Sequence, residues 1–422
     1  MRSPLVGADD DAGGRRRLRP VIQAMELGGL GILPLMAVLF RLHWLLAEHL
    51  LAVDYSQGPW GAGHRLFAGL SPYVGAHSAA VGGITFVYPA VAALVLAPFS
   101  LLPRDVAGAA FTMLDLAAIL VTLRVLAVRD WRVYGACLLW PSILSGWETA
   151  NVTLLLALGI AVAWRWRDTP LVTGVMIALL ISVKLFVWPL ALWLIATRRY
   201  RAFGHAVAAG LAMNLLAWGV LGFDQITRYR ELLAALAGAQ QDRGYSVMAL
   251  LLNGGAPLPL ASTLAACLTL LGAGVCLAAG RRLGSQASFA LCIVTGLIAT
   301  PISWLHYFAL LVVPLAIARP RLSLLWLLPI LFAFPTVGPD ASEILIMFGV
   351  GAAVCLVSAQ PTALVSAQST RLVSARPTGE PACDGLPAER AGQGGKMRRR
   401  RAATLTDDVR SLAGKLSHAG RE

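Results

Sequence analysis

The sequence predicts an all-α polytopic membrane protein, and three observations support this fold class. Hydrophobic residues make up 57% of the chain, charged residues only 14%, and the mean hydropathy is +0.70. Soluble domains carry about 25% charged residues, so this composition lies far outside their range. Long apolar runs recur along most of the chain, and basic residues gather at the ends of these runs.

The apolar runs define the expected helices in order. A transmembrane helix needs about 20 apolar residues, or roughly 17 to 25. Several runs are shorter, and the one around Lys184 is too long for a single crossing. We therefore expect about 10 to 12 transmembrane helices, some short or re-entrant, with irregular backbone buried in protein. The runs are Leu27–Leu51, Phe86–Leu102, Val106–Val128, Val133–Trp147, Thr149–Trp164, Leu171–Thr197, Phe203–Phe223, Leu258–Ala279, Ala287–Thr300, Ile302–Ala318, Leu322–Phe334 and Ile344–Val357.

The net charge of +13 comes from basic clusters at the ends of apolar runs. These clusters lie at residues 15–19, 198–201, 281–282 and 396–401. Such a distribution is the positive-inside pattern of a membrane protein, and it argues against nucleic-acid binding. Residues 1–24 are therefore expected to be a disordered basic tail in the cytoplasm, with the first helix running outward.

Asp54 lies just beyond the first apolar run, at the start of a loop from 52 to 86 that is expected to be extracytoplasmic. An acid followed by an aromatic and glycine-rich loop at this position can face both water and lipid. A reaction between a lipid-linked donor and a polar acceptor would need a base there. The helical spacing of Trp60, His64, Phe67 and Leu70 predicts a short interfacial helix within the loop, and an ordinary connecting loop is the alternative.

The rest of the chain divides simply. Residues 25–357 are expected to form the transmembrane domain, and residues 358–422 a low-complexity disordered tail in which an eight-residue segment is nearly repeated. The polar segment 224–257 either contacts substrate or connects two spans. The six cysteines have no metal or redox spacing, and the chain has no nucleotide-binding or phosphate-cradling motif, so no cofactor and no metal are expected.

Lys184 is the charged residue deepest within an apolar run, and such a residue is costly in a membrane and therefore a functional candidate. Arginines flank its run, 171–197, on both sides at Arg165 and Arg198. If both flanks are cytoplasmic, the run is a hairpin of two short helices with Lys184 near the outer apex. There the amine can pair with a lipid phosphate; the alternatives are a lysine that snorkels to a headgroup or pairs with a buried acid.

Three further polar residues are candidates. Glu148 and Asn151 lie in a polar break between two apolar runs, where they either bind a sugar hydroxyl or cap the following helix. His306 opens another span shortly after Pro301. It either contacts a donor phosphate, orients Asp54, or is a buried histidine with satisfied hydrogen bonds.

Several short segments occur in a characteristic order and spacing. They are Asp54-Tyr55, residues 66–73 ending in Ser71-Pro72-Tyr73, Phe86-Val87-Tyr88-Pro89-Ala90, residues 97–103, Asn151-Val152-Thr153-Leu154-Leu155, Val183-Lys184-Leu185 with Pro189, and Pro301-Ile302-Ser303-Trp304-Leu305-His306-Tyr307. Between about residues 27 and 357 the chain resembles glycosyltransferase family 87. These are polyprenyl-phosphate-mannose-dependent mannosyltransferases of cell-envelope biosynthesis with the GT-C fold.

The resemblance implies a mechanism and a set of site residues. Asp54 would be the general base that removes a proton from the acceptor hydroxyl, and Lys184 and His306 would bind the donor phosphate, which leaves with inversion. The candidates for substrate binding are Tyr55, Tyr73, Tyr88, Glu148, Asn151 and Trp304. The partners would be a polyprenyl-phosphate sugar donor and a lipid-anchored glycan acceptor, at the extracytoplasmic face of the plasma membrane.

Two other classes of function stay open. A transporter or flippase of a lipid-linked sugar would often show paired inverted repeats, and no such duplication is evident in the sequence. A catalytically degenerate envelope partner is the third hypothesis. Three departures from the family pattern bear on it and on the choice of acceptor: Ala90 after Tyr88-Pro89, Glu148-Thr149-Ala150 before Asn151, and Leu305 before His306.

Overall fold

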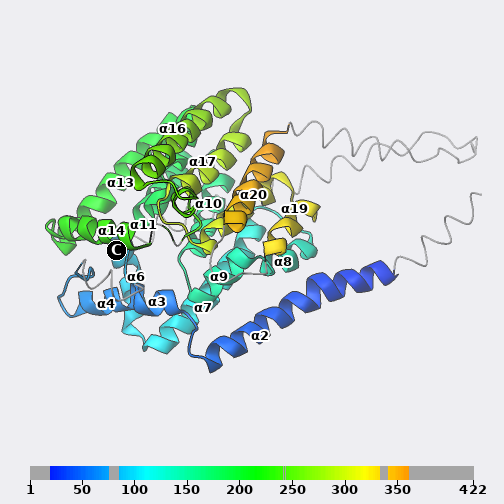
Figure 1. Cartoon of the computed structure of the whole chain (residues 1–422), viewed down its shortest axis with the longest axis horizontal. Coiled ribbons are helices and arrows are strands. Elements are labelled where there is room, and N and C mark those ends of the chain that lie inside the picture. Colours follow the sequence, from blue (N-terminus) through cyan, green and yellow to red (C-terminus); the bar gives the residue numbers. More distant parts are fainter. Residues whose placement is uncertain (1–19, 76–84, 241, 243, 333–340, 361–422) are drawn as a thin grey trace, which may run out of the picture. The chain divides into compact units, whose positions relative to one another are not determined.

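The computed structural model describes residues 20–75, 85–240, 242, 244–332 and 341–360. These residues form helices joined by short connections, and none of them forms a β-strand (Figure 1). The predicted all-α class is therefore confirmed. The first helix already begins at Pro20, so residues 20–24 belong to this helix rather than to the predicted disordered tail. Proline suits this position because the first helical residue needs no N–H partner. Residues 1–19 and the tail after Gln360 lie outside the described residues.

The elements follow one another closely along the chain. In order they are the π-helical turn η1 (Gly28–Ile32), α2 (Leu33–Ala47), α3 (Val53–Gln57), α4 (Pro59–Phe67), α6 (Ala90–Leu96), η2 (Ala97–Leu101), α7 (Arg104–Val125), α8 (Trp131–Leu138), α9 (Pro141–Thr149), α10 (Thr153–Arg165), α11 (Pro170–Val183), η3 (Leu185–Val187), α12 (Leu190–Ala196), α13 (Tyr200–Leu221), α14 (Gln225–Gln240), α15 (Val247–Asn253), α16 (Leu258–Arg282), α17 (Ser285–Ala299), η4 (Leu305–Leu311), α18 (Val312–Ala318), α19 (Leu324–Leu327), η5 (Leu328–Phe332) and α20 (Ala341–Ala359). α4 agrees with the short helix predicted in the outer loop.

Five of the described helices are long and apolar enough to cross a membrane, and they confirm a multi-pass protein. They are Pro20–Ala47, Arg104–Val125, Tyr200–Leu221, Leu258–Arg282 and Ser342–Ala359. α9 and α10, bent by 117°, make a sixth span if they cross as a pair. Several apolar helices are shorter, such as α11 and α17, and these would have to cross as well to reach the predicted total of about 10 to 12.

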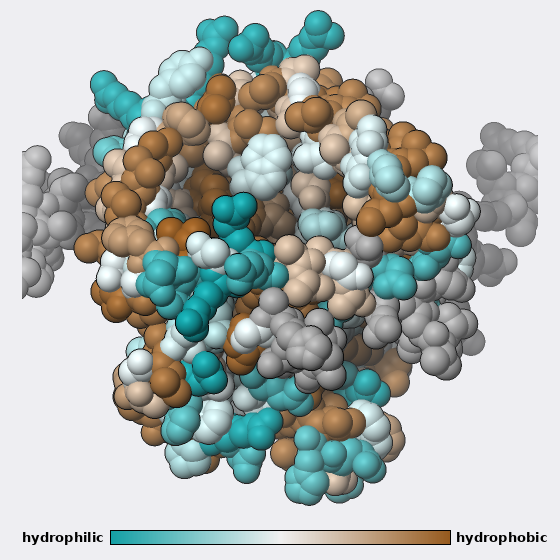
Figure 2. Space-filling view, turned by 60° about the vertical axis from the view of Figure 1, so that its left-hand side comes forward, coloured by the Kyte–Doolittle hydropathy of each residue, from teal (hydrophilic) through white to brown (hydrophobic). Residues whose placement is uncertain are grey.

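The long helices α13 and α16 present apolar side chains outward. Leu211, Leu216 and Val220 of α13 are 61%, 71% and 71% exposed, and Leu270 of α16 is 73% exposed. Exposed apolar surface on this scale is unusual in a soluble protein and suits contact with lipid chains. The space-filling view shows apolar residues in a band below the polar residues of the upper rim, with more polar residues in the lower half (Figure 2).

The apolar run 171–197 folds as a hairpin, as its flanking arginines predict. α11 and α12 are its two short arms, and Lys184 lies at the turn between them in an extended backbone conformation, with φ −148°. At the open end, Arg199 donates a hydrogen bond of 2.9 Å to Asp168 and another to the carbonyl of Arg167. These bonds hold the two ends of the hairpin side by side.

The segment that carries Asp54 is held against the break between α9 and α10. Ala150 takes a left-handed conformation at this break, with φ 55°. Ala52, also left-handed with φ 58°, donates its backbone N–H to the carbonyl of Glu148 at 2.8 Å. Left-handed alanine is uncommon and costs free energy, so one such residue on each side of this junction marks it as constrained. α3 begins one residue later, beside Asn151.

Tyrosine side chains fix the segment that precedes α6. The Tyr73 hydroxyl donates to the carbonyl of Tyr88 at 3.2 Å, and the Tyr229 hydroxyl donates to the carbonyl of Val87 at 3.3 Å. The rings of Tyr73, Tyr229 and Trp218 also lie within 6.0 Å of one another. Residues 87 and 88 are thus anchored to the aromatic cluster of α13 and α14, and α14 forms one wall of the site described next.

Candidate active site

A chain of hydrogen bonds connects Asp54 with Lys184, which come from distant parts of the sequence. Asn151 Nδ2 donates to Asp54 Oδ2 at 3.2 Å. Lys184 Nζ donates to Asn151 Oδ1 at 3.2 Å and to Thr153 Oγ1 at 2.8 Å. Asn151 therefore contacts both the predicted base and the predicted phosphate-binding residue.

Asn151 also caps a helix. Its Oδ1 accepts hydrogen bonds from the backbone N–H of Thr153 at 3.1 Å and from the Thr153 hydroxyl at 2.7 Å, at the start of α10. The sequence left open whether this residue caps a helix or binds a sugar hydroxyl. The structure shows the contacts with the start of α10 and places the side chain at a cavity wall. Because the cap fixes the amide oxygen, it also fixes where the amide nitrogen meets Asp54.

Lys184 is enclosed by aromatic rings. Its Nζ lies 3.9 Å from the ring centroid of Tyr307, 5.5 Å from that of Tyr88 and 5.6 Å from that of Phe186. Only 6% of the residue is exposed. Cation–π contacts of this kind attract the charged amine and hold it in place.

Lys184 has no carboxylate partner at ion-pair distance in the part of the chain that the structure describes. Asp115 of α7 is fully buried, and both of its carboxylate oxygens lack a hydrogen bond from any described residue. The alternative in which Lys184 pairs with a buried acid is therefore not observed among these residues. A buried cation without a carboxylate at ion-pair distance is costly, so this position favours an anionic ligand.

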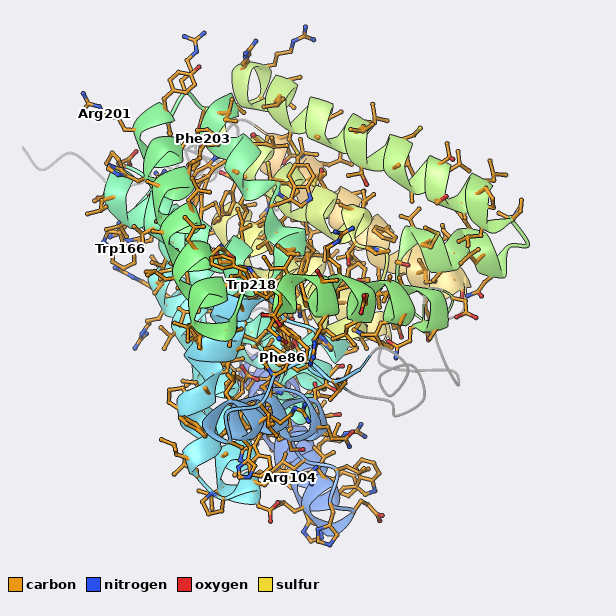
Figure 3. The ribbon with its side chains drawn as sticks, turned by 90° about the vertical axis from the view of Figure 1, so that its left-hand side faces the viewer. Phe86, Arg104, Trp166, Arg201, Phe203 and Trp218 are labelled. Carbon is orange, nitrogen blue, oxygen red and sulfur yellow. The ribbon has the colours of Figure 1, made fainter. Side chains whose placement is uncertain are left out.

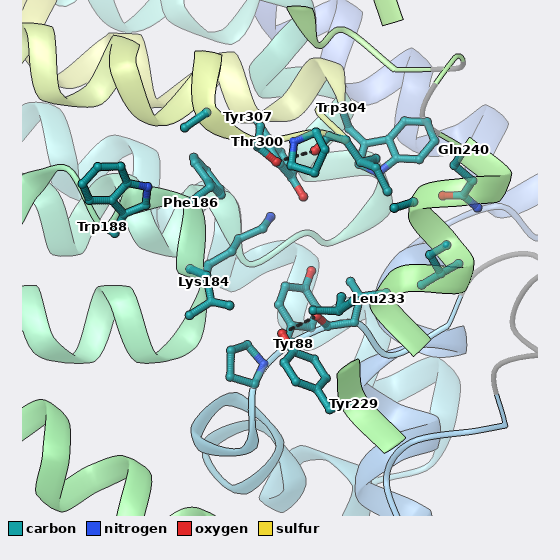
Figure 4. Close-up of a pocket in the computed structure, with 18 residues that line it drawn as sticks. Tyr88, Lys184, Phe186, Trp188, Tyr229, Leu233, Gln240, Thr300, Trp304 and Tyr307 are labelled. Atoms are coloured by element: carbon teal, nitrogen blue, oxygen red, sulfur yellow. Dashed lines mark hydrogen bonds between the residues drawn. The ribbon is translucent and has the colours of Figure 1, made fainter. Parts of the chain in front are cut away.

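Two adjoining cavities meet at these residues. The first, of about 340 Å³, is lined largely by apolar and aromatic side chains with Lys184 among them (Figure 4). The second, of about 390 Å³, is lined by Asp54, Asn151 and His306 together with Ser145 and Thr149. The two cavities share six lining residues: Val87, Tyr88, Leu236, Gln240, Trp304 and Tyr307. A ligand with an apolar tail and a polar head would therefore fit across both.

Six of the nine predicted site residues line these cavities: Asp54, Tyr88, Asn151, Lys184, Trp304 and His306. His306 is 4% exposed, and its Nε2 has no hydrogen-bond partner among the described residues. His306 is therefore not the buried histidine with satisfied hydrogen bonds that was one alternative from the sequence. Gly146 makes room for it, because a Cβ at this position would lie 3.3 Å from the His306 Cβ.

The other three predicted residues lie outside the cavities. Glu148 faces α2 instead, where it accepts two hydrogen bonds from Arg41 at 2.7 and 3.0 Å. Tyr55 is fully buried against Phe111, with ring centroids 4.6 Å apart. Tyr73 supports the backbone of Tyr88 rather than lining the site. These three side chains support neighbouring segments and do not line the site.

Three residues that line the cavities were not singled out from the sequence, although two of them lie in the polar segment 224–257 that was a candidate for substrate contact. Tyr307 covers Lys184, Gln240 borders both cavities, and Tyr229 lines the first one. Tyr307 belongs to the segment 301–307 that carries the resemblance, and it directly follows His306. It could therefore have been predicted as a site residue from the sequence. Gln240 and Tyr229 lie on α14, a polar helix whose contact with the site depends on the tertiary fold.

The fold and the site together define a multi-pass α-helical membrane protein with a carboxylate and a buried amine at two joined cavities. Residues 86–305 match the family model described as glycosyltransferase family 87. The chain belongs to this family, and it is accordingly a membrane glycosyltransferase. No curated protein and no solved structure matches the chain.

The matched region covers only part of the site. It contains Tyr88, Asn151, Lys184 and Trp304, and it ends one residue before His306. Asp54 lies before its start. The contact between Asn151 and Asp54 is what connects the matched region to the acid on α3.

Proposed function

We propose that the protein transfers mannose from a polyprenyl-phosphate donor to a lipid-linked glycan acceptor in cell-envelope biosynthesis, with inversion at the anomeric carbon. An arabinofuranosyl donor is a close variant of this reaction. The site would face the extracytoplasmic side of the plasma membrane, as the basic N-terminal cluster predicts. The observation that carries the proposal is the buried amine of Lys184, which has no ion-pair partner among the described residues and lies in an apolar cavity that adjoins the cavity of Asp54.

The first cavity suits the lipid phosphate of the donor. Lys184 is the one charged side chain among the described residues that line it, and aliphatic and aromatic groups such as Leu185, Phe186 and Leu233 make up most of the rest. An isoprenoid chain would contact these apolar groups, and its phosphate would supply the missing counter-charge to the amine.

The second cavity suits the sugar and the acceptor hydroxyl. Its lining includes the carboxylate of Asp54 and polar groups of Thr149, Asn151 and His306. Tyr88 and Trp304 lie on the wall that both cavities share, so a sugar linked to the phosphate would pass beside their rings. Concave sites with a few convergent polar groups in a largely apolar lining are typical of ligand binding.

The proposed reaction is one displacement. The ionised carboxylate of Asp54 accepts the proton of the acceptor hydroxyl, and the acceptor oxygen forms a bond to the anomeric carbon. The bond from that carbon to the phosphate oxygen breaks on the opposite face, and polyprenyl phosphate leaves with the electron pair. Lys184 offsets the charge that develops on the phosphate. His306 lines the second cavity, and it would donate to the phosphate where the two cavities join.

A transfer assay in liposomes tests this function against a transporter. Purified protein is reconstituted with radiolabelled polyprenyl-phosphate-mannose, or the arabinose analogue, and a cell-envelope lipid extract as acceptor. We expect labelled glycolipid to form and polyprenyl phosphate to accumulate in equal amount. If intact donor moves to the other leaflet and no glycolipid forms, the protein is a transporter. If the donor is neither consumed nor moved, the protein is a degenerate partner.

The pH dependence of transfer should report on Asp54. Burial raises the pKa of this carboxyl above its ordinary value of 3.8, although hydrogen bonds from Asn151 and Thr149 and the charge of Lys184 act in the opposite direction. Only the ionised carboxylate can accept a proton, so a raised pKa moves the loss of rate to a higher pH. In kcat/KM measured against pH, the acid limb should lie above the range of an exposed aspartate; a rate that stays level through that range would contradict this role.

Replacing Asn151 with alanine should move the acid limb of kcat/KM to still higher pH. The variant removes a hydrogen-bond donor from the Asp54 carboxylate, so the pKa of Asp54 rises and the acid limb moves to higher pH. The rate at neutral pH should fall about tenfold or more, the cost of losing a hydrogen bond to a charged group. The control is Asn214→Ala, which removes an asparagine bonded to Ser182 at 2.8 Å outside the cavities. An unshifted limb in Asn151→Ala would show that Asn151 only caps α10.

A further inference from the structure

A third cavity, of about 490 Å³, lies away from the active site and is lined by arginines. It forms where the connection from α10 to α11 meets the junction between α12 and α13. Arg167, Arg198, Arg199 and Arg201 line it, with Asp168 as the single acid. Four positive charges against one negative charge leave this cavity with a net charge of +3.

Most of this positive charge is uncompensated. Arg199 contacts Asp168 and the carbonyl of Arg167, and Arg167 donates to the carbonyl of Trp164 at 3.1 Å. The side chains of Arg198 and Arg201 make no hydrogen bond or ion pair with any residue that the structure describes. Two guanidinium groups are thus open to a ligand, and guanidinium groups match phosphate geometry well.

Two helices begin at the same cavity. α11 starts at Pro170 and α13 at Tyr200, and neither N-terminus has a side-chain cap. The two helices pack closely near these ends, because a Cβ on Gly174 would lie 3.0 Å from the backbone nitrogen of Ala206. The positive ends of both helix dipoles therefore add to the field of the arginines.

Apolar side chains next to the cavity place it at the level of lipid headgroups. Trp166, Leu171 and Tyr200 are 44%, 57% and 60% exposed there. Tryptophan and tyrosine favour the membrane–water interface, and leucine favours the acyl chains. Arg201 lies at the end of the molecule opposite Arg104, which bonds to Ser56 two residues after Asp54, so the cavity is remote from the active site (Figure 3).

We infer that this arginine cavity binds the phosphate headgroup of an anionic phospholipid, whose acyl chains lie along the exposed apolar residues of α11 and α13. A soluble anion would use the same arginines but not the apolar surroundings. The arginines that orient a membrane protein need no cavity, so a defined site goes beyond the positive-inside pattern. This site is independent of the proposed transfer reaction.

Native mass spectrometry of the full chain in detergent tests the inference. The probes are phosphatidylglycerol, phosphatidylcholine with the same acyl chains, and inorganic phosphate. We expect phosphatidylglycerol to bind with one preferred stoichiometry, and the double variant Arg198→Gln, Arg201→Gln to weaken it at least about tenfold, given what each basic group contributes at a membrane surface. The control Arg281→Gln, Arg282→Gln removes two exposed arginines from the last turn of α16 and should leave binding unchanged.

Three outcomes would overturn the inference. Equal weakening in both double variants would mean that only the overall charge attracts the lipid. Equal binding of phosphatidylcholine would mean that the headgroup charge is not recognised. Competition by inorganic phosphate as strong as that of phosphatidylglycerol would assign the cavity to a soluble anion. Thermal unfolding of each variant without lipid shows that the fold is kept before binding is compared.

Discussion

Replacing Asp54 with asparagine is expected to reduce the rate of sugar transfer by about 10²- to 10⁴-fold, the usual contribution of a positioned general base. The amide matches the carboxylate in size, and its oxygen can still accept from Asn151, so α3 should stay in place. The amide cannot take a proton from the acceptor hydroxyl. Binding of the donor should be retained, because Lys184 lies in the other cavity. Initial rates with labelled donor, together with donor binding, measure both effects.

The matched control is Asp105→Asn. Asp105 is an exposed acid in the first turn of α7, and it lines neither cavity. This variant loses the same charge from the same class of residue and should transfer sugar at the parent rate. If Asp54→Asn also kept the parent rate, Asp54 would not be the base, and His306 would be the next candidate because it lines the same cavity.

Much of the fold was predictable because membrane crossing imposes strong rules. Apolar runs and their basic ends indicate where helices lie, and the arginines that flank residues 171–197 predicted the hairpin with Lys184 at its turn. Helix breaks were harder to place. The bend between α9 and α10 depends on the left-handed Ala150 and on the contact of Ala52 with Glu148, and neither alanine carries a sequence signal for this conformation.

The site was predictable where a polar residue has no role other than function in an apolar setting. Lys184 is of this kind, and it lines the first cavity. Asn151 also lines a cavity, although the sequence left a capping role open for it. Glu148 was assigned to the substrate on the same reasoning, but it pairs with Arg41, which precedes it by 107 residues. A partner so distant in the sequence is visible only in the tertiary structure. Composition alone does not distinguish a charge that faces a cavity from one that joins two helices.

Tyr55 and Tyr73 illustrate the same limit for aromatic residues. Both belong to segments that resemble the family, but one packs on Phe111 and the other supports the backbone of Tyr88. The resemblance points to whole segments and does not indicate which side chain of each segment lines a cavity. That direction follows from the helix or turn that carries the residue and from what packs behind it.

Replacing Lys184 with methionine is expected to reduce transfer by about 10²- to 10³-fold, the usual cost of removing one group that stabilises charge in the transition state. Methionine fills a similar volume and suits the contacts with Tyr307 and Phe186. The variant should be at least as stable as the parent towards heat, because a buried amine without a carboxylate partner is replaced by an apolar group. A lower rate with an unchanged or higher Tm is therefore the expected pair of results.

Binding of polyprenyl phosphate and of uncharged polyprenol separates a phosphate role from a purely structural one. The parent should prefer the phosphate, and Lys184→Met should lose this preference while it still binds the isoprenoid through the apolar wall. Arg104→Gln is the control: it removes a positive charge that bonds to Ser56, close to α3 but outside both cavities, and the preference should persist. If Lys184→Met kept the preference for phosphate, the amine would serve to hold Asn151 and Thr153, and the donor phosphate would have to be bound by another group such as His306.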